Sequence, residues 1–282
     1  MNGEFWKVAH RGRHDFHVEN TLEAFRAAYD AGCDMVEFDV QLSRDGVPVI
    51  FHDDDCRRLA GVGRNVFDMD YDELRNLELR WKPGRASEPP YRIPSLERFL
   101  AEFGKRAFYL ELKVPAAVAE NRGYIETLAG KCAAMVTAAG SHPDTFMASF
   151  HGGILRHLAS ARLFPALGGI FEDYPRFREV HSGEDAETAA ALRHFSVSWK
   201  VFRRYLDEWR EAAERAARQA PVKAPQPDNP ARRGSAPGDT GMFLIWDIRG
   251  AEAFREALSS GVRGLVVDEV DLMIRIAREA YS

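Results

Sequence analysis

The sequence has few cysteines, and their spacing matches no cysteine motif. Cys33, Cys56 and Cys132 are odd in number and far apart, so the pattern predicts neither a disulfide framework nor a C-x-x-C metal or redox site. The stretch MNGEFWKVAHRGR lacks the apolar run of a signal peptide, and no window approaches the roughly 18 apolar residues of a membrane span. We therefore expect a cytoplasmic protein without stable membrane insertion.

An excess of positive charge is also missing. The 38 Lys and Arg residues are outnumbered by 43 Asp and Glu residues, which gives a formal net charge of -5. This balance provides no bulk electrostatic reason to expect nucleic acid or an anionic membrane surface as a partner. An anionic substrate would have to be bound by local positive groups.

A G-x-G-x-x-G turn after a strand is absent as well, which argues against a dinucleotide-binding fold. Short apolar runs rich in β-branched and aromatic residues instead alternate with segments of helical periodicity. The runs are FWKVAH, DMVEFDV, AFYLELK, TFMASF, PALGGIF, FSVSWKV, MFLIWDI and GLVVDEV. Strands that alternate with helices pair in parallel, so eight such units predict one (β/α)8 TIM barrel over residues 1–282. An open doubly wound sheet is the alternative.

Several of the expected helices carry Asn, Ser or Asp at the start and Gly just past the end, as helix caps require. They include NTLEAFRAAYDAG, SLERFLAEFG, AETAAALRHF, RYLDEWREAAERAARQ and GAEAFREALSSG. Residues 52–94 interrupt the repeat after the second strand, and we expect an insertion there in which DMDYDELRNLEL forms one short helix. Residues 220–241, rich in Pro, Gly and charge, are predicted to form a mobile or disordered loop.

Ionisable residues gather where the first three expected barrel strands end, which is where barrel enzymes place their chemistry. Each strand contributes a neighbouring pair or an i, i+2 pair, and residues two apart in a strand project to the same face. In a small barrel that face points inward or into the mouth. The residues are His10, Arg11, Glu37, Asp39, Glu111 and Lys113.

A second histidine is expected to join this group through a hairpin. If Asp45-Gly46 is a two-residue turn, counting outward from it pairs Asp39 with His52, whose Cβ atoms would lie about 5 Å apart. A β-bulge between them would break this pairing. We therefore predict His52 opposite Asp39, with a bulge as the condition that would overturn it.

Three converging carboxylates, Glu37, Asp39 and Glu111, repel one another unless a positive group lies among them. Buried ion pairs with Arg11 and Lys113 are one solution. The third acid favours metal ligation instead, and oxygen-only ligands favour one divalent cation, Mg²⁺ or Ca²⁺, over zinc.

Arg11 and Lys113 could also bind an anionic group, since the guanidinium fork suits phosphate oxygens. His10 and His52, on either side of a metal and a phosphate, could act as general acid and base near neutral pH. Together these residues predict metal-assisted phosphoester chemistry.

The ordered motifs resemble those of the glycerophosphodiester phosphodiesterase family. They are HRG at 10–12, ENTLEAF at 19–25, EFDVQLSRDGVPVIFHD at 37–53, IPSLERFL at 93–100, ELK at 111–113, ASF at 148–150 and, more weakly, GVRGLVVDE at 261–269. The resemblance implies a TIM barrel that hydrolyses small glycerophosphodiesters to glycerol 3-phosphate and an alcohol, using Mg²⁺ or Ca²⁺.

The same resemblance implies a role for each matching residue. Glu37, Asp39 and Glu111 would be metal ligands, His10 and His52 the acid and base, and Arg11 and Lys113 the phosphate-binding residues. Trp246 would line the substrate pocket, although packing at the barrel rim is the simpler interpretation of a lone tryptophan.

The chain departs from the family pattern at several positions. Val18 replaces a usual proline, Asp247 and Arg249 are unexpected charges beside Trp246, and Val267 precedes Asp268 where the family commonly has Thr-Asp. Histidines in the motif loops, His14, His17 and His151, could contact the substrate.

Two other functions remain open. A lysophospholipase D would use the same site but would need an apolar surface for acyl chains. A barrel that binds phosphodiesters without turnover is disfavoured, because the set of acids and histidines is intact.

Overall fold

The structure is a computed structural model. It describes residues 5–80, 90–164, 166–181, 183, 186–192, 194–219, 242–260 and 262–281. The loop predicted at 220–241 lies outside these residues, as do residues 81–89 of the predicted insertion.

Eight parallel strands form a closed barrel, as predicted. Each strand pairs with the next one along the barrel, and β1 pairs with both β9 and β2, which closes the sheet. The barrel strands are β1 (Trp6–Ala9), β2 (Met35–Leu42), β4 (Phe108–Leu112), β5 (Phe146–Ser149), β6 (Leu167–Phe171), β7 (His194–Ser198), β8 (Met242–Trp246) and β9 (Gly264–Val267).

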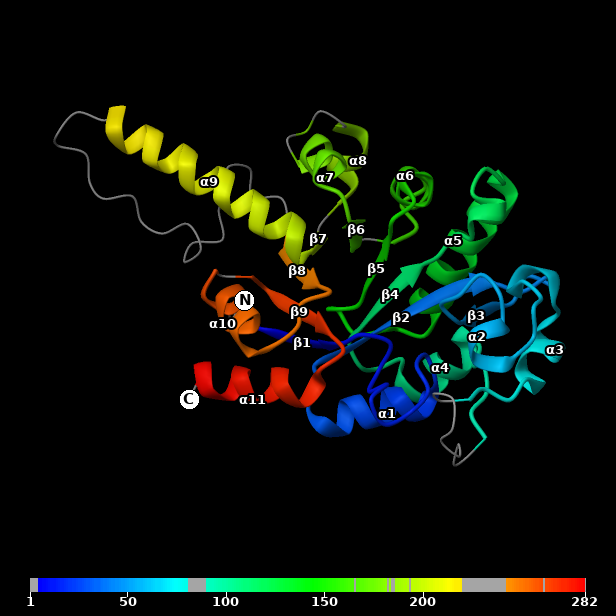
Figure 1. The fold of residues 1–282 in the computed structure, drawn as a ribbon. Coiled ribbons are helices and arrows are strands. Elements are labelled where there is room, and N and C mark those ends of the chain that lie inside the picture. The colour runs from blue at the N-terminus through cyan, green and yellow to red at the C-terminus, as the bar shows by residue number, and fades with distance from the viewer. Residues whose placement is uncertain are drawn as a thin grey trace.

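Helices follow the strands and lie around the barrel (Figure 1). Thr21 and Ser95 accept hydrogen bonds at the starts of α1 and α4, as N-cap residues do. The helices outside the barrel are α1 (Leu22–Ala31), α4 (Leu96–Phe103), α5 (Arg122–Ala138), α6 (Gly152–Ser160), α7 (Tyr174–His181), α8 (Ala186–Ala191), α9 (Trp199–Gln219), α10 (Ala251–Ser259) and α11 (Val270–Tyr281).

Some element boundaries differ from the predicted ones. The run FSVSWKV is not all strand, because the Ser198 hydroxyl accepts a hydrogen bond from the Val201 amide and α9 already begins at Trp199. The segment AETAAALRHF is not all helix either. His194 instead enters β7, where it pairs with strand residues on both sides.

Side chains of β2 alternate between two environments. Phe38 packs outside the barrel against Phe25, Phe99 and Phe108, with ring centroids 5.5, 4.3 and 5.6 Å away. A separate apolar cluster that includes Val8, Tyr109, Phe146, Ala148, Leu244 and Val266 forms from the opposite faces of the strands. The outer packing of Phe38 leaves its neighbours Glu37 and Asp39 on the inner face.

A ninth strand, β3 (Pro48–Ile50), pairs antiparallel with β2 and lies outside the barrel order. Val40 lies opposite Ile50, and the Phe51 amide donates to the Asp39 carbonyl at 3.0 Å. The predicted pairing of Asp39 with His52 is therefore wrong by one residue.

The connection between β2 and β3 explains the shift. The Gly46 amide donates to the Ser43 carbonyl, and the Ser43 amide donates to the Val47 carbonyl. Gly46 has a φ of 74°, the left-handed conformation of the glycine in a G1 bulge. This extra residue in the turn moves every later residue of β3 by one position.

The segment after β3 has its own small hydrophobic cluster. It contains α2 (Arg57–Ala60), a 3-10 turn (Val66–Asp68) and α3 (Tyr71–Asn76), the last within the predicted short helix. Its buried side chains, which pack together apart from the main core, include Val49, Phe51, Val66, Leu74, Leu79 and Ile93.

Phe99→Ala should destabilise the barrel by about 3–5 kcal/mol, because it empties the centre of the outer aromatic cluster. Urea unfolding followed by circular dichroism would measure the loss. Phe16→Ala is the control, since this side chain is 57% exposed and its removal should change stability by less than about 1 kcal/mol. Equal effects of the two substitutions would contradict the assigned core.

Candidate active site

Three acidic side chains meet inside the barrel. Glu37 and Asp39 lie two residues apart on β2, and Glu111 on β4 is the direct register partner of Asp39. Their exposed fractions are only 3%, 1% and 8%. One carboxylate oxygen from each lies within 4.8 Å of the others, so these acids converge as the strand pattern predicts.

Burial and mutual repulsion perturb these carboxyl groups unequally. Burial and the charge of Asp39 raise the pKa of Glu111 to about 7, and burial with the charges of Asp39 and Glu111 raises that of Glu37 well above its usual value. Burial acts in the same direction on Asp39, but Arg11 and Lys113 outweigh it and lower the pKa of Asp39. A divalent cation would relieve the repulsion, and a set of buried carboxylate oxygens fits Mg²⁺ or Ca²⁺.

Arg11 binds this cluster with both its backbone and its side chain. Its amide donates to Glu37 Oε2 at 3.0 Å, and its Nε lies 3.3 Å from Asp39 Oδ2. The backbone of Arg11 has a φ of 51°, which is uncommon for a residue other than glycine. Lys113 Nζ lies 3.7 Å from Asp39 and 3.8 Å from Glu111. Both predicted phosphate-binding residues are therefore adjacent to the carboxylates.

His10 follows β1 and approaches the cluster from one side. Its Nδ1 atom lies 2.7 Å from Asp268 Oδ1, and its Nε2 atom lies 3.9 Å from Glu37 Oε2. Burial lowers the pKa of His10, although the hydrogen bond to Asp268 opposes that shift. A lowered pKa favours a neutral ring, which is the form that can accept a proton.

His52 lies near Asp39, and a charge on its ring would add to the effect of Arg11 and Lys113 in lowering the pKa of that acid. Its position depends on the loop after β3 and not on the predicted cross-strand pairing. Its Nδ1 atom is 2.8 Å from Asp53 Oδ1, and Arg58 bridges Asp53 and Glu19 with contacts of 2.7 Å to each. Glu19 also accepts a hydrogen bond from the Arg11 guanidinium, which completes a charged chain between the two sides of the site.

Trp246 ends β8 and packs against the apolar cluster within the barrel. Its ring meets Phe150 edge to face at 5.8 Å. Its Nε1 atom is buried and has no hydrogen-bond partner among the described residues. The residue lies at the same end of the barrel as the carboxylates.

The unexpected charges after Trp246 have partners. Asp247, with a φ of 57°, accepts a hydrogen bond from the Trp199 amide at 3.0 Å. Arg249 Nη2 lies 3.6 Å from Asp268 Oδ2. Arg249 thus extends the group around Asp268, whereas Asp247 holds the start of α9.

Sequence reasoning gave no role to Asn20 or Asp268, although each contacts a predicted site residue. Asn20, with a φ of 58°, donates from its side-chain amide to Asp39 Oδ2 at 2.9 Å. It belongs to the ENTLEAF motif, which carried the resemblance without assigning Asn20 a role. The available signal for Asn20 was that a polar residue of a motif lies near a buried acid, Asp39.

Comparison with known proteins places this geometry in a family. The model of the Glycerophosphoryl diester phosphodiesterase family matches residues 10–272. The chain belongs to this family. The match begins directly after β1 and ends in the first turn of α11, and therefore contains every residue of the site described above.

Individual members of the glycerophosphoryl diester phosphodiesterase family resemble parts of the chain. Lysophospholipase D GDPD3 of Mus musculus is 36% identical over 111 residues, 38% of this chain and 34% of that protein. Glycerophosphodiester phosphodiesterase of Caldanaerobacter subterraneus is 32% identical over 123 residues, 43% of this chain and 49% of that protein. The chain thus matches between a third and a half of the length of these relatives.

A solved Oleispira antarctica phosphodiesterase, in complex with the product sn-glycerol-3-phosphate, shares the fold. Its TM-score is 0.71 at 20% identity, with 97% of this chain and 96% of that chain covered.

Among the residues that the structure describes, we find no helix long and apolar enough to cross a membrane.

Removal of one acid should weaken metal binding. Asp39→Asn should weaken Mg²⁺ or Ca²⁺ binding at least about 10-fold in isothermal titration calorimetry, because it removes both a ligand and the lowest-pKa carboxylate of the cluster. Asp54→Asn, which changes an exposed acid in the loop after β3, is the matched control and should bind normally. Equal losses in the two variants would disprove the assigned ligands.

Metal affinity should also depend on pH. Glu111, whose pKa is raised to about 7, must lose its proton before it can bind a cation. Affinity should therefore fall as the pH decreases through about 7 and level off above it. Titrations in two buffers of different ionisation enthalpy would show proton release on binding, and the absence of release at pH 7 would contradict this prediction.

Proposed function

We propose that the chain hydrolyses glycerophosphodiesters to glycerol 3-phosphate and an alcohol with the help of one divalent cation. The observation that carries the proposal is the buried group Glu37, Asp39 and Glu111 at the mouth of the barrel, with a histidine on each side. Family membership supports the same reaction class. The product seen with the Oleispira antarctica phosphodiesterase supports the glycerol phosphate product.

The charged residues would position the substrate. A cation held by the three acids would reduce the charge at phosphorus and acidify the nucleophile. Arg11 and Lys113, which flank the acids, would bind the remaining phosphate oxygens. The buried setting strengthens these interactions, because little water competes for the charges.

The two histidines would divide the proton transfers. His10 and His52 approach from different loops, so one can take the proton of the nucleophile while the other protonates the departing alcohol. The nucleophile is either water or the 2-hydroxyl of the substrate, which would pass through a cyclic phosphate. The active unit in this proposal is the single barrel domain of residues 1–282, whose insertion at 52–94 supplies His52, in a cytoplasmic protein.

A lysophospholipase D activity is the second candidate. In the part of the chain that the structure describes, two large hydrophobic side chains are exposed, Phe16 at 57% and Phe150 at 48%. Both lie in loops that follow the carboxyl ends of barrel strands, β1 and β5, where the site also lies. An acyl chain could pack on them while the phosphate occupies the same polar site.

His10→Ala and His52→Ala should each lower kcat by about 10²-fold or more, since each removes a proton carrier. Release of glycerol 3-phosphate from glycerophosphocholine in a coupled assay would measure this. His142→Ala, a substitution in the turn before β5 at the other end of the barrel, is the control. Near-normal rates in either site variant, with an unchanged melting temperature, would exclude the assigned role.

Substrate choice should separate the two activities. We expect hydrolysis of glycerophosphocholine or glycerophosphoethanolamine in a metal-dependent screen read by phosphorus NMR. If lysophosphatidylcholine is preferred instead, Phe150→Ala should raise its KM about 10-fold through lost apolar contact, and leave the KM of glycerophosphocholine unchanged. An equal effect on both substrates would show that Phe150 does not contact an acyl chain.

A further inference from the structure

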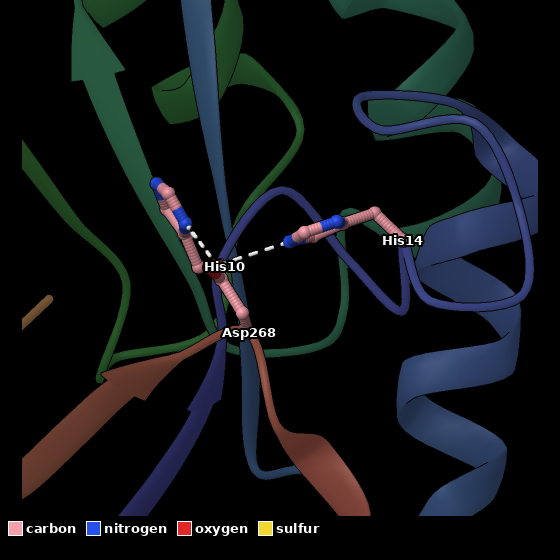
Figure 2. A group of neighbouring side chains, drawn as sticks. All are labelled: His10, His14 and Asp268. Atoms are coloured by element: carbon pink, nitrogen blue, oxygen red, sulfur yellow. Dashed lines mark hydrogen bonds and ion pairs between the residues drawn. The ribbon is translucent and has the colours of Figure 1, made fainter. Parts of the chain in front are cut away.

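Asp268 lies between two histidines at the mouth of the barrel (Figure 2). Its Oδ1 atom is 2.7 Å from Nδ1 of His10 and 3.0 Å from Nε2 of His14. The pairing of β1 with β9 brings Asp268 to this position, and the His10 amide donates to the Val267 carbonyl beside it. Both side-chain distances are those of hydrogen bonds.

The hydrogen bonds determine where the protons are. Burial opposes ionisation of Asp268, but the bonds from His10 and His14 outweigh it and keep the pKa of Asp268 well below its usual range. An ionised carboxylate only accepts hydrogen bonds, so both facing ring nitrogens carry hydrogen. In neutral His10 the remaining nitrogen, Nε2, then holds the lone pair.

That lone pair is directed toward the reaction site. Nε2 of His10 lies 3.9 Å from Glu37 Oε2, which is beyond hydrogen-bond distance. The nitrogen is therefore not occupied by the carboxylate and faces the region beside the three acids. A nucleophile bound there could give its proton to it.

The carboxylate of Asp268 is itself held in place. His14, in the loop after β1, binds the same oxygen as His10, and Arg249 Nη2 lies 3.6 Å from the other oxygen. Rotation of the Asp268 side chain would break these contacts. His14 and Arg249 thus orient the acceptor of the His10 hydrogen bond.

We propose that Asp268 is a positioning residue that holds His10 as the Nδ1–H tautomer, and that His14 is the residue that orients Asp268. This rests on the proposed function, and within it assigns the role of general base to His10. Nε2 takes the proton of the attacking O–H group, whose electron pair forms the new bond to phosphorus. The P–O bond to the alcohol breaks, and His52 supplies the proton to that oxygen. Asp268 stays ionised and stabilises the positive His10 ring.

Asp268→Asn in the full chain should lower kcat for glycerophosphocholine on the order of 10²- to 10⁴-fold and leave KM nearly unchanged, because an amide can favour the other tautomer. Asp271→Asn is the matched control. Asp271 also joins the loop after β1 to α11, through Arg13 at 2.5 Å, and nothing in the structure shows it in contact with His10. We expect its kcat to stay within about 2-fold of the wild type.

The tautomer of His10 can be measured without an activity assay. In protein labelled with ¹⁵N-histidine, the ring signals of His10, identified by their loss in His10→Ala, should show Nδ1–H in the wild type. In Asp268→Asn they should shift toward Nε2–H. Wild-type kcat together with unchanged His10 signals in Asp268→Asn would overturn the proposal.

Substitutions of His14 test the proposal that this residue orients Asp268. His14→Ala should lower kcat about 3- to 10-fold, and His14→Gln, whose amide can still donate to Asp268, should restore most of it. Equal kcat values for wild type and His14→Ala would contradict the orienting role, even if Asp268→Asn does not fold. If the wild type hydrolyses no glycerophosphodiester, the proposed function fails, whereas the His10 ring signals still decide whether Asp268 sets the tautomer.

Discussion

The repulsion among Glu37, Asp39 and Glu111 is the constraint on which the site depends. Three carboxylates on neighbouring strands lose solvation and oppose one another, so the surrounding structure must supply positive charge and hydrogen-bond donors. Arg11 does so with its amide and its guanidinium, and Asn20 donates to the most strongly ionised acid. Both residues adopt left-handed backbone conformations to reach these acceptors. The loop after β1 thus has the backbone conformation that lets Arg11 and Asn20 reach the buried carboxylates.

The arrangement of the acids could be predicted because strand parity is independent of the loops. Glu37 and Asp39, two residues apart on β2, must project to one face, and the register of β4 places Glu111 beside Asp39 on that face. The hairpin register could not be predicted as safely. Asp45-Gly46 suits a two-residue turn and a bulged turn equally, and the hydrogen bonds of Ser43 select the latter.

Contacts between segments far apart in the sequence were harder to predict than the hairpin register. His10 and Asp268 are separated by 258 positions, and they meet only because β9 pairs with β1 when the barrel closes. By sequence, His14 was one of three loop histidines that could contact the substrate, and its hydrogen bond with Asp268 depends on that same closure. The insertion after β3 likewise has its own fold, so the place of His52 follows from tertiary packing and not from a repeating pattern.

The small cluster formed by Val49, Phe51, Val66, Leu74 and Ile93 has a consequence for how this protein can change. These residues pack mainly with one another, while contacts such as those of Arg44 with Met69 and Arg58 with Glu19 tie the segment to the loops of the barrel. A chimera carrying this segment from a related barrel would keep the three acids, which belong to β2 and β4. It would receive a new residue at the position of His52. In the proposed function, cation binding and proton delivery would then depend on separate parts of the chain.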